Sequence, residues 1–407
     1  MVSTASVAPQ TFKLSQIRRP IRDLQAQLVD WRRHLHQYPE LGFKEQQTAE
    51  FVATKLAAWG IAHQTQIAQT GVVATLESQH PGPVVAIRAD MDALPIQEQN
   101  DVPYRSRHDG VMHACGHDGH TAIALGLAHY LMQHRDQWQG TVKIIFQPAE
   151  EGPGGAKPMI EAGVLQNPTV DGMFGLHLWN NLPLGTVGVR PGYLMAAVES
   201  FWCTVLGKGG HGAMPHQTVD AVVVGSQIVN ALQTVVSRTV NPLDSAVVTV
   251  GEFHAGSRHN VIADTARLSG TVRYYNPNLE GQLGQRIEAI IAGICQMQGA
   301  TYDLDYAPLY PAVINDERMA AIVRDAAFAV IETPAGVVPE CQTMAAEDMS
   351  YFLRAVPGCY FFLGTANPGL GLDYPHHHPR FNFDESALCV GVELFVRCIE
   401  RFSEVTV

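Results

Sequence analysis

Short apolar segments that end in polar, chemically reactive residues recur along the first half of the chain. Such segments lie at 84–87, 141–146 and 172–176, and a helical stretch with Ile123 and Leu127 on one face separates the first two. Continuous apolar strands that alternate with helices are typical of a sheet buried on both faces. The pattern predicts an α/β domain with a mixed, mostly parallel sheet flanked by helices.

The sequence pattern changes near residue 195. From 201 to 306 the expected elements follow the order strand, helix, strand, strand, helix, strand, which matches a ferredoxin-like layer. A length of 407 residues also favours two domains. We therefore expect residues 195–307 to form an inserted ferredoxin-like α+β domain, and residues 1–194 and 308–407 to form the first domain together.

The composition restricts partners and location. The net charge is -12 and the chain has no Lys- or Arg-rich run, which argues against a nucleic-acid or anionic-membrane partner. The seven cysteines are scattered and odd in number, so we expect no disulfide framework. No apolar run approaches the roughly 18 residues that a membrane helix needs, and the chain start lacks the apolar region of a signal peptide. We expect a cytoplasmic protein.

Residues 112–120, Met-His-Ala-Cys-Gly-His-Asp-Gly-His, bring together one thiol, three imidazoles and a carboxylate. Cys115 and His117 are two residues apart, so both can point to one side of an extended or turn segment. Thiolate and imidazole are side chains that divalent transition metals prefer. Cys115 and His117 are therefore candidate metal ligands. His113 and His120 could orient a ligand, or could serve a helix start or the surface.

Further candidate residues follow the ends of other expected strands. Glu150 and Glu151 come soon after the strand at 141–146, and neighbours on an extended segment point to opposite sides. One of them could bind a metal ion while the other handles protons. His177 directly follows the strand at 172–176. Sites in open α/β sheets form at the carboxyl edge, so the pattern predicts a two-metal hydrolytic site.

Some assignments stay open from the residues alone. Asp92, after the strand at 84–87, could hydrogen-bond a ligating imidazole or cap the following turn. His177 taken alone fits a buried core histidine better than a ligand. Of the three histidines at 376–378, only one fits comfortably as a ligand.

Taken together, these motifs resemble the M20 metallopeptidases. Within that family they resemble the branch of N-acyl-amino-acid amidohydrolases that includes hippurate hydrolases and auxin-conjugate hydrolases. The resemblance covers about residues 24–397, nearly the whole chain. It depends on ordered motifs at 35–43, 88–95, 113–118, 147–152, 175–177 and 377–381.

The resemblance implies a centre of two divalent metal ions and names its residues. The implied ligands are Cys115, His117, Glu151, His177 and His377. Glu150 is implied as the general base that activates a water and later passes the proton to the leaving amine, and Asp92 as the carboxylate that orients a ligand. His377 is chosen by alignment with the family's His-x-Pro pattern, with His376 as the alternative. The donor set suits Mn²⁺ or Zn²⁺, and Co²⁺ or Ni²⁺ also fit.

The inserted domain resembles the lid or dimerisation domain of the family. The glycine-rich segment around His211 matches the one whose histidine reaches a partner's active site to polarise the scissile carbonyl. Asn260 and Arg273 match lid residues that hold the substrate carboxylate, for which Arg offers a bidentate fork. A strand-surface charge is the alternative for Arg273. The resemblance thus implies a homodimer or higher homo-oligomer.

These expectations lead to one principal hypothesis and several rivals. The principal one is a dinuclear metal-dependent amidohydrolase that cleaves the amide bond of an N-acyl or aryl-acyl L-amino acid, a small-molecule substrate. The alternative on the same scaffold is a metallo-carboxypeptidase, a dipeptidase or an N-acetyl-diaminopimelate deacetylase. A metal-dependent binding protein without catalysis is a third hypothesis, and the complete ligand set argues against it. A cysteine-nucleophile or redox enzyme would leave the other metal-type ligands unused.

Overall fold

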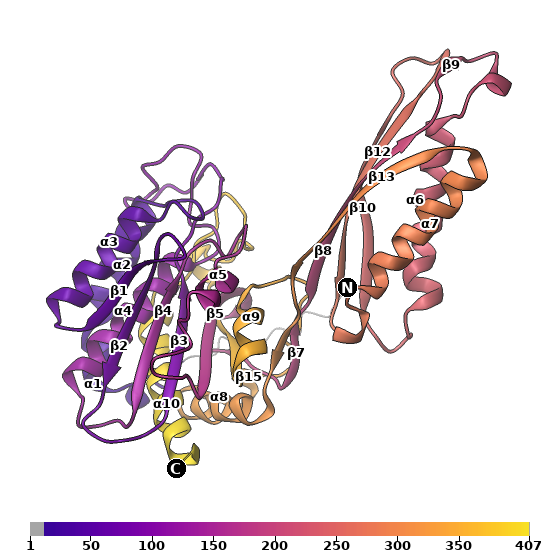
Figure 1. Ribbon diagram of the computed structural model, residues 1–407. Coiled ribbons are helices and arrows are strands. Elements are labelled where there is room, and N and C mark those ends of the chain that lie inside the picture. Colours follow the sequence, from indigo (N-terminus) through magenta and orange to yellow (C-terminus); the bar gives the residue numbers. More distant parts are fainter. Residues whose placement is uncertain (1–11, 407) are drawn as a thin grey trace. The chain divides into compact units, whose positions relative to one another are not determined.

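The computed structural model describes residues 12–406, which divide into two compact units (Figure 1). The first unit comprises the chain up to Leu194, Ile314–Cys341, and the chain from Tyr351 onward. The second comprises Met195–Val313 and Gln342–Ser350. The second unit contains the predicted segment 195–307 and, in addition, residues 308–313 and 342–350. That 195–307 forms a separate domain stays a prediction.

The first unit is built around an eight-stranded mixed sheet in the order β1-β2-β4-β3-β5-β16-β6-β15. Strand β3 pairs in parallel with β4 and β5, and β5 pairs in parallel with β16. The outer pairs β1–β2 and β2–β4 are antiparallel. The strands are β1 (Ala62–Ile67), β2 (Gly71–Glu77), β3 (Val84–Asp90), β4 (Thr141–Gln147), β5 (Gly172–Pro183), β6 (Val187–Gly188), β15 (Val337–Val338) and β16 (Gly358–Ala366). The predicted mixed α/β sheet is confirmed.

The helices of the first unit surround this sheet. They are α1 (Arg19–Asp23), α2 (Gln25–Gln37), α3 (Gln46–Ala58), α4 (His117–Gln133), α5 (Ala156–Glu161), α8 (Glu317–Val330) and α10 (Ala387–Thr406), with α9 (Met349–Ala355) at a boundary between the units. Helix α4 packs against both α2 and α10. A Cβ on Gly126 of α4 would lie 2.5 Å from Leu28 Cδ2 and 3.0 Å from Val392 Cγ2. The absence of a side chain at Gly126 therefore permits this close three-helix packing.

The second unit contains a four-stranded antiparallel sheet in the order β10-β12-β8-β13. Helices α6 and α7 lie together on one face of it (Figure 1). The apolar core joins Val205 and Leu268 of the sheet to Ile228 and Ile287 of the helices. The elements are β8 (Ala197–Leu206), α6 (Ala221–Thr239), β10 (Ala246–Ala255), β12 (Thr265–Tyr274), α7 (Gln282–Gln298) and β13 (Thr301–Tyr310). The unit has the predicted ferredoxin-like arrangement.

Two small sheets complete the structure. Strands β9 (Gly210–His211) and β11 (Val261–Ile262) form a ribbon at one end of the second unit (Figure 1). Strands β7 (Gly192–Met195) and β14 (Val313–Asn315) pair where the chain passes between the units. All seven cysteines are buried and free of disulfides. Among residues 12–406, no helix combines the length and apolar character needed to cross a bilayer.

Candidate metal centre

The candidate ligands of the first unit meet at one edge of its sheet. Strands β3, β4 and β5 run in parallel, so the residues that follow or end them lie at a common edge. Asp92 follows β3, Glu150 and Glu151 follow β4, and His177 lies within β5. Cys115 and His117 stand where α4 begins, and the left-handed φ of 95° at Gly116 between them is one that glycine adopts without strain.

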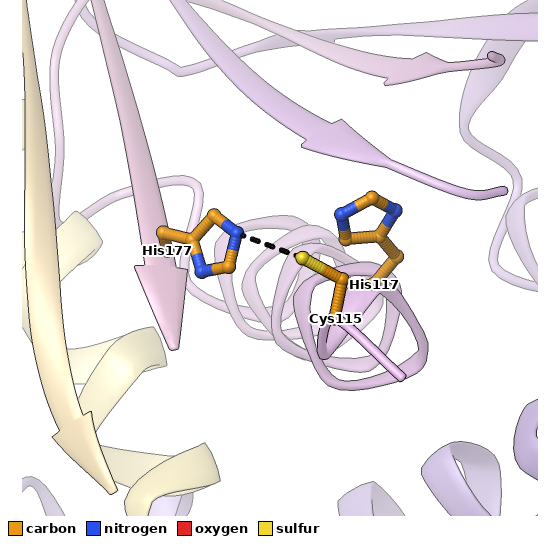
Figure 2. Close-up of side chains that lie close together, drawn as sticks. All are labelled: Cys115, His117 and His177. Atoms are coloured by element: carbon orange, nitrogen blue, oxygen red, sulfur yellow. Dashed lines mark hydrogen bonds between the residues drawn. The ribbon is translucent and has the colours of Figure 1, made fainter. Parts of the chain in front are cut away.

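Cys115, His117 and His177 lie close together, as Figure 2 shows. Cys115 Sγ is 3.5 Å from His177 Nε2. The other ring nitrogen of His177, Nδ1, donates to the Leu178 carbonyl at 2.8 Å, so Nε2 carries the lone pair that faces the sulfur. Burial lowers the pKa of His177 well below its usual range. A neutral imidazole in this tautomer is ready to bind a cation.

His117 is oriented by Asp92. His117 Nδ1 lies 2.9 Å from the Asp92 carbonyl oxygen and 3.2 Å from Asp92 Oδ1, so it donates to this residue. His117 Nε2 is buried and has no hydrogen-bond partner. Burial lowers the pKa of His117, but Asp90 and Asp92 outweigh it and raise that pKa to about 10. The negative environment therefore favours a positive charge at this position, which a bound metal cation would supply in place of the proton.

Glu151 and His377 lie on the other side of Cys115. Glu151 Oε1 lies 3.0 Å from His377 Nε2, as an ion pair, and the Glu151 backbone N–H donates to Asp92 Oδ2 at 2.9 Å. Each of the groups Cys115–His117–His177 and Cys115–Glu151–His377 has its ligand atoms within 4.8 Å of one another. The two groups share the cysteine sulfur.

The structure separates the two neighbouring histidines of the 376–378 segment. His376 Nε2 lies 2.9 Å from the Leu178 carbonyl, to which it donates, and its ring packs against Trp179. His377 has a left-handed φ of 64° and donates its backbone N–H to the Ala114 carbonyl. This conformation turns the His377 ring toward Glu151. The geometry thus favours His377 over His376 as the ligand.

The donor set fits divalent transition metals. It combines one thiol, three imidazoles and a carboxylate, which are ligands of zinc and related ions. Burial, with Glu151 and Glu150 nearby, raises the pKa of the Cys115 thiol well above its usual range. A cation would reverse this effect, because metal binding and thiol deprotonation are coupled. His117 Nε2, which is buried and has no hydrogen-bond partner, is an atom that a cation would satisfy.

Glu150 is buried and lies beside these groups without belonging to either. Its Oε2 is 4.0 Å from His117 Nε2, and its ligand oxygen lies within 4.8 Å of those of His117 and Glu151. It follows Ala149, which has a left-handed φ of 55°. Two consecutive carboxylates thus have different surroundings.

Sequence reasoning missed the part played by Asp90. Asp90 Oδ1 is 2.6 Å from His120 Nδ1, and Oδ2 is 2.6 Å from an Arg88 nitrogen. His120 Nε2 accepts the Leu178 N–H at 2.9 Å, so both ring nitrogens of His120 are occupied by hydrogen bonds. His120 therefore connects β3, α4 and β5, and its ring lies against the rings of His117 and His177. The only signal in the sequence was the position of Asp90 at the same strand end as Asp92.

The remaining predicted residues lie in the second unit. His211 and Asn260 are exposed and adjacent in the β9–β11 ribbon, where Gly212 N–H donates to the Asn260 carbonyl at 2.9 Å. Arg273 lies near the far end of β12 (Thr265–Tyr274), and at about 3.3 Å per residue it is roughly 25 Å from the end that leads to the ribbon. Arg273 is half-buried, and no carboxylate in the described chain forms an ion pair with it.

Comparison with known proteins identifies the family. The model of peptidase family M20/M25/M40 matches residues 86–401, and the chain belongs to this family. YhaA of Bacillus subtilis (strain 168) is 48% identical over 369 residues, which are 90% of this chain and 92% of YhaA. The N-acyl-L-amino acid amidohydrolase of Geobacillus stearothermophilus is 46% identical over 301 residues, 74% of this chain and 81% of that protein.

A solved structure shares the fold along the whole chain. The Bacillus subtilis YXEP protein, described as a dinuclear metal binding peptidase from the M20 family, superposes with a TM-score of 0.80 at 35% identity. The match covers 95% of this chain and 100% of YXEP. The resemblance stated from the sequence motifs is confirmed. The family members are hydrolases acting on amide bonds, and this chain is an enzyme of that class.

Proposed function

We propose that this protein is a dinuclear metal-dependent amidohydrolase that cleaves the amide bond of N-acyl or aryl-acyl L-amino acids, releasing a carboxylic acid and an amino acid. The observation that carries the proposal is the pair of ligand groups that share Cys115 beside a separate buried carboxylate, Glu150. The Geobacillus relative is named for this reaction. A second copy of the chain completes the site.

The metal ions would be held by Cys115, His117 and His177 on one side and by Cys115, Glu151 and His377 on the other. When bound, such ions polarise the substrate carbonyl and lower the pKa of water. Mn²⁺ or Zn²⁺ is the proposed metal, with Co²⁺ or Ni²⁺ as substitutes, because thiolate, imidazole and carboxylate accommodate all of them.

The protein's own residues handle orientation and the proton. Glu150 takes the proton of the attacking water and later gives it to the leaving amine, since it lies beside the ligand groups without being tied into one. The Asp92 carboxylate accepts hydrogen bonds from His117 Nδ1 and from the backbone N–H of Glu151. It therefore keeps two ligands in place while Glu150 exchanges protons.

The positions of the lid residues support the proposal of a homodimer. His211 and Asn260 lie roughly 25 Å from Arg273 along β12, so one chain cannot place all three on one small substrate. Two copies can, if the ribbon of one subunit supplies His211 and Asn260 to the other. The partner's His211 would then stabilise the oxyanion, and Arg273 together with the partner's Asn260 would hold the substrate carboxylate.

The sheet of the second unit has one edge suited to a second copy. Edge strand β10 exposes Val247 and Phe253, and exposed Val223 lies on the neighbouring helix α6. The opposite edge, β13, carries Asp303 and Asp305 outward, a charged edge that resists pairing. We propose β10 as the dimer edge.

The composition of the chain supports a proposal for its location and partners. Seven unpaired cysteines and a net charge of -12 support a cytoplasmic enzyme with a small-molecule substrate, without nucleic-acid or membrane partners.

The test is amino-acid release from a substrate panel. The protein is stripped with a chelator, reloaded with Mn²⁺ or Zn²⁺, and given N-acetyl, N-benzoyl and indole-acetyl amino acids together with dipeptides. Metal-dependent release from an acylated amino acid is the expected result. Release from dipeptides alone would assign the chain to the peptidases instead, and no release from any substrate by the metal-loaded protein would contradict the proposal.

A further inference from the structure

Arg32 and His36 lie one helical turn apart on α2, and neither belongs to the ligand groups. Both side chains are fully buried. Arg32 Nε donates to Asp118 Oδ2 at 2.8 Å, and His36 Nδ1 lies 2.8 Å from the same oxygen. Asp118 directly follows the candidate ligand His117 in the first turn of α4. These two side chains of α2 therefore hold the end of α4 that carries His117.

Arg32 also contacts the segment that follows His377. One terminal guanidinium nitrogen donates to Asn382 Oδ1 at 2.9 Å, and the other lies 3.1 Å from Glu385 Oε1. The guanidinium plane is rigid, so its nitrogens set the distance between the groups they bind. Arg32 thus spaces the start of α4 from the segment that carries His377.

His36 reaches the same segment by a second route. Its Nε2 lies 3.2 Å from Glu98 Oε1, to which Asn100 Nδ2 also donates at 3.0 Å. Asn100 Nδ2 donates in addition to the Phe381 carbonyl at 3.0 Å. The chain from Glu98 to Asn100 is therefore held against the residues just after His377.

The charges in this cluster balance only when His36 is protonated. Both ring nitrogens of His36 face carboxylate oxygens, and a neutral imidazole has only one N–H to donate. Burial and Arg32 lower the pKa of His36, but its hydrogen bonds to Asp118 and Glu98 outweigh them and raise it. A buried carboxylate facing an imidazole lone pair would be left without compensation. His36 is therefore an imidazolium that bridges Asp118 and Glu98.

We propose that Arg32 and His36 are positioning residues of the metal centre. They fix the Cys115–His117 turn against the segment that carries His377, and so set the spacing of the two ligand groups. This inference depends on the proposed metal-dependent function. Ligands from chain segments about 260 residues apart need such a connection to be held in place before the ion binds.

The test is Arg32→Lys, with Arg18→Lys as the matched control. Lysine keeps the positive charge beside Asp118 but lacks the planar fork that also reaches Asn382. Arg18 likewise pairs with two carboxylates, at 2.8 Å to Glu393 and 2.6 Å to Glu400 of α10, but its side chain is partly exposed and makes no contact with the metal groups. Co²⁺ affinity is measured through the cobalt–thiolate absorption of Cys115. The other measurements are the melting temperature, kcat and KM.

We expect Arg32→Lys to weaken binding of at least one Co²⁺ by about 10–100-fold and to lower kcat more than KM changes. Arg18→Lys should lose less thermal stability, because Arg18 is partly exposed, and should keep the wild-type Co²⁺ affinity. Equal Co²⁺ affinity and kcat in the two variants would overturn the positioning role alone. A wild-type protein that binds no Co²⁺ would overturn both this inference and the proposed function.

A second variant keeps the inference testable if Arg32→Lys does not fold. Asn382→Ala removes the guanidinium contact at 2.9 Å and leaves the Arg32–Asp118 pair in place. The expected result is weaker Co²⁺ binding, with kcat reduced in the folded, metal-saturated variant. Unchanged Co²⁺ affinity and kcat would overturn the role of this contact in spacing the ligand groups.

Discussion

The metal centre of the first unit and the ribbon of the second unit are built on opposite principles. At the centre, the ligands are mostly buried and their remaining polar atoms are already committed: His177 Nδ1 to Leu178, and His117 Nδ1 to Asp92. In the ribbon, His211 and Asn260 are exposed, and the ribbon strands are two residues long. Only the centre is held in place within one chain.

The ligand groups are preorganised within one chain, whereas the exposed ribbon residues are the ones for which we propose a partner subunit. Buried ligands with fixed tautomers need little reorganisation free energy when a cation binds. An exposed histidine gains a fixed position only when another surface packs on it. We therefore propose that metal binding needs only one chain, whereas full catalysis needs the proposed dimer.

Glu150→Gln should abolish most turnover while the metal stays bound. General acid–base catalysis contributes about 10²–10⁴-fold, and glutamine cannot accept the proton. The measurement is kcat for an N-acyl amino acid together with metal content by elemental analysis. Asp109→Asn, on the exposed surface, serves as the control. A Glu150→Gln protein with the wild-type kcat would remove Glu150 as the base.

His211→Ala should lower kcat by about 10²–10³-fold, as expected for the loss of one oxyanion donor. The trans arrangement is tested by mixing His211→Ala and Glu150→Gln subunits, each nearly inactive alone. A mixed dimer has one site with intact Glu150 and the partner's intact His211, so random reassociation should restore about a quarter of wild-type activity. No recovery in verified mixed dimers would place His211 in its own subunit's site or outside catalysis.

Asp92→Asn should weaken metal binding by about 10–100-fold, because Asp92 orients His117 and holds the Glu151 backbone. Asp171→Asn is the matched control, since Asp171 Oδ2 accepts the Val84 N–H at 2.8 Å, at the start of β3 rather than at its end. The measurement is calorimetric titration of the stripped proteins with Mn²⁺. Equal affinities for the two variants would show that Asp92 does not orient a ligand.

The contribution of His36 to stability should depend on pH. Its folded pKa is raised above the ordinary 6.5, so the stabilisation is fully present below pH 6.5 and is lost as the pH rises through the folded pKa. The groups that face it are Arg32, Asp118, Glu98 and the rings of Tyr104 and His113. The difference in melting temperature between wild type and His36→Gln should therefore be largest below pH 6.5 and should decrease as the pH rises through the folded pKa. A difference that does not change with pH would contradict the imidazolium assignment.

Much of the centre could be predicted because its residues follow strands that the sequence pattern reveals. Once β3, β4 and β5 are expected to be parallel, Asp92, Glu150 and His177 must meet at one edge. The choice between His376 and His377 could not be made that way. It depends on a left-handed backbone at His377 and on the Leu178 carbonyl, which lies about 200 residues away in sequence.

Other features were hidden because they depend on contacts between distant segments. Arg32 looks like a surface charge in a helix, yet it is buried because Asp118 and Asn382 pack on it. The inclusion of 342–350 in the second unit likewise follows from pairing, since Met195 bridges to Thr343. No local pattern marks either feature.

A metal titration of the stripped protein, with bound metal and amino-acid release recorded on the same samples, shows directly whether hydrolysis depends on two bound ions. The wild type should bind two Mn²⁺ or Zn²⁺ ions per chain, and release from an N-acyl amino acid should appear as they bind. Cys115→Ala, which removes the donor shared by both ligand groups, should bind fewer ions and release none. Full amino-acid release without metal, or unchanged metal content in Cys115→Ala, would contradict a two-metal hydrolytic centre that shares Cys115.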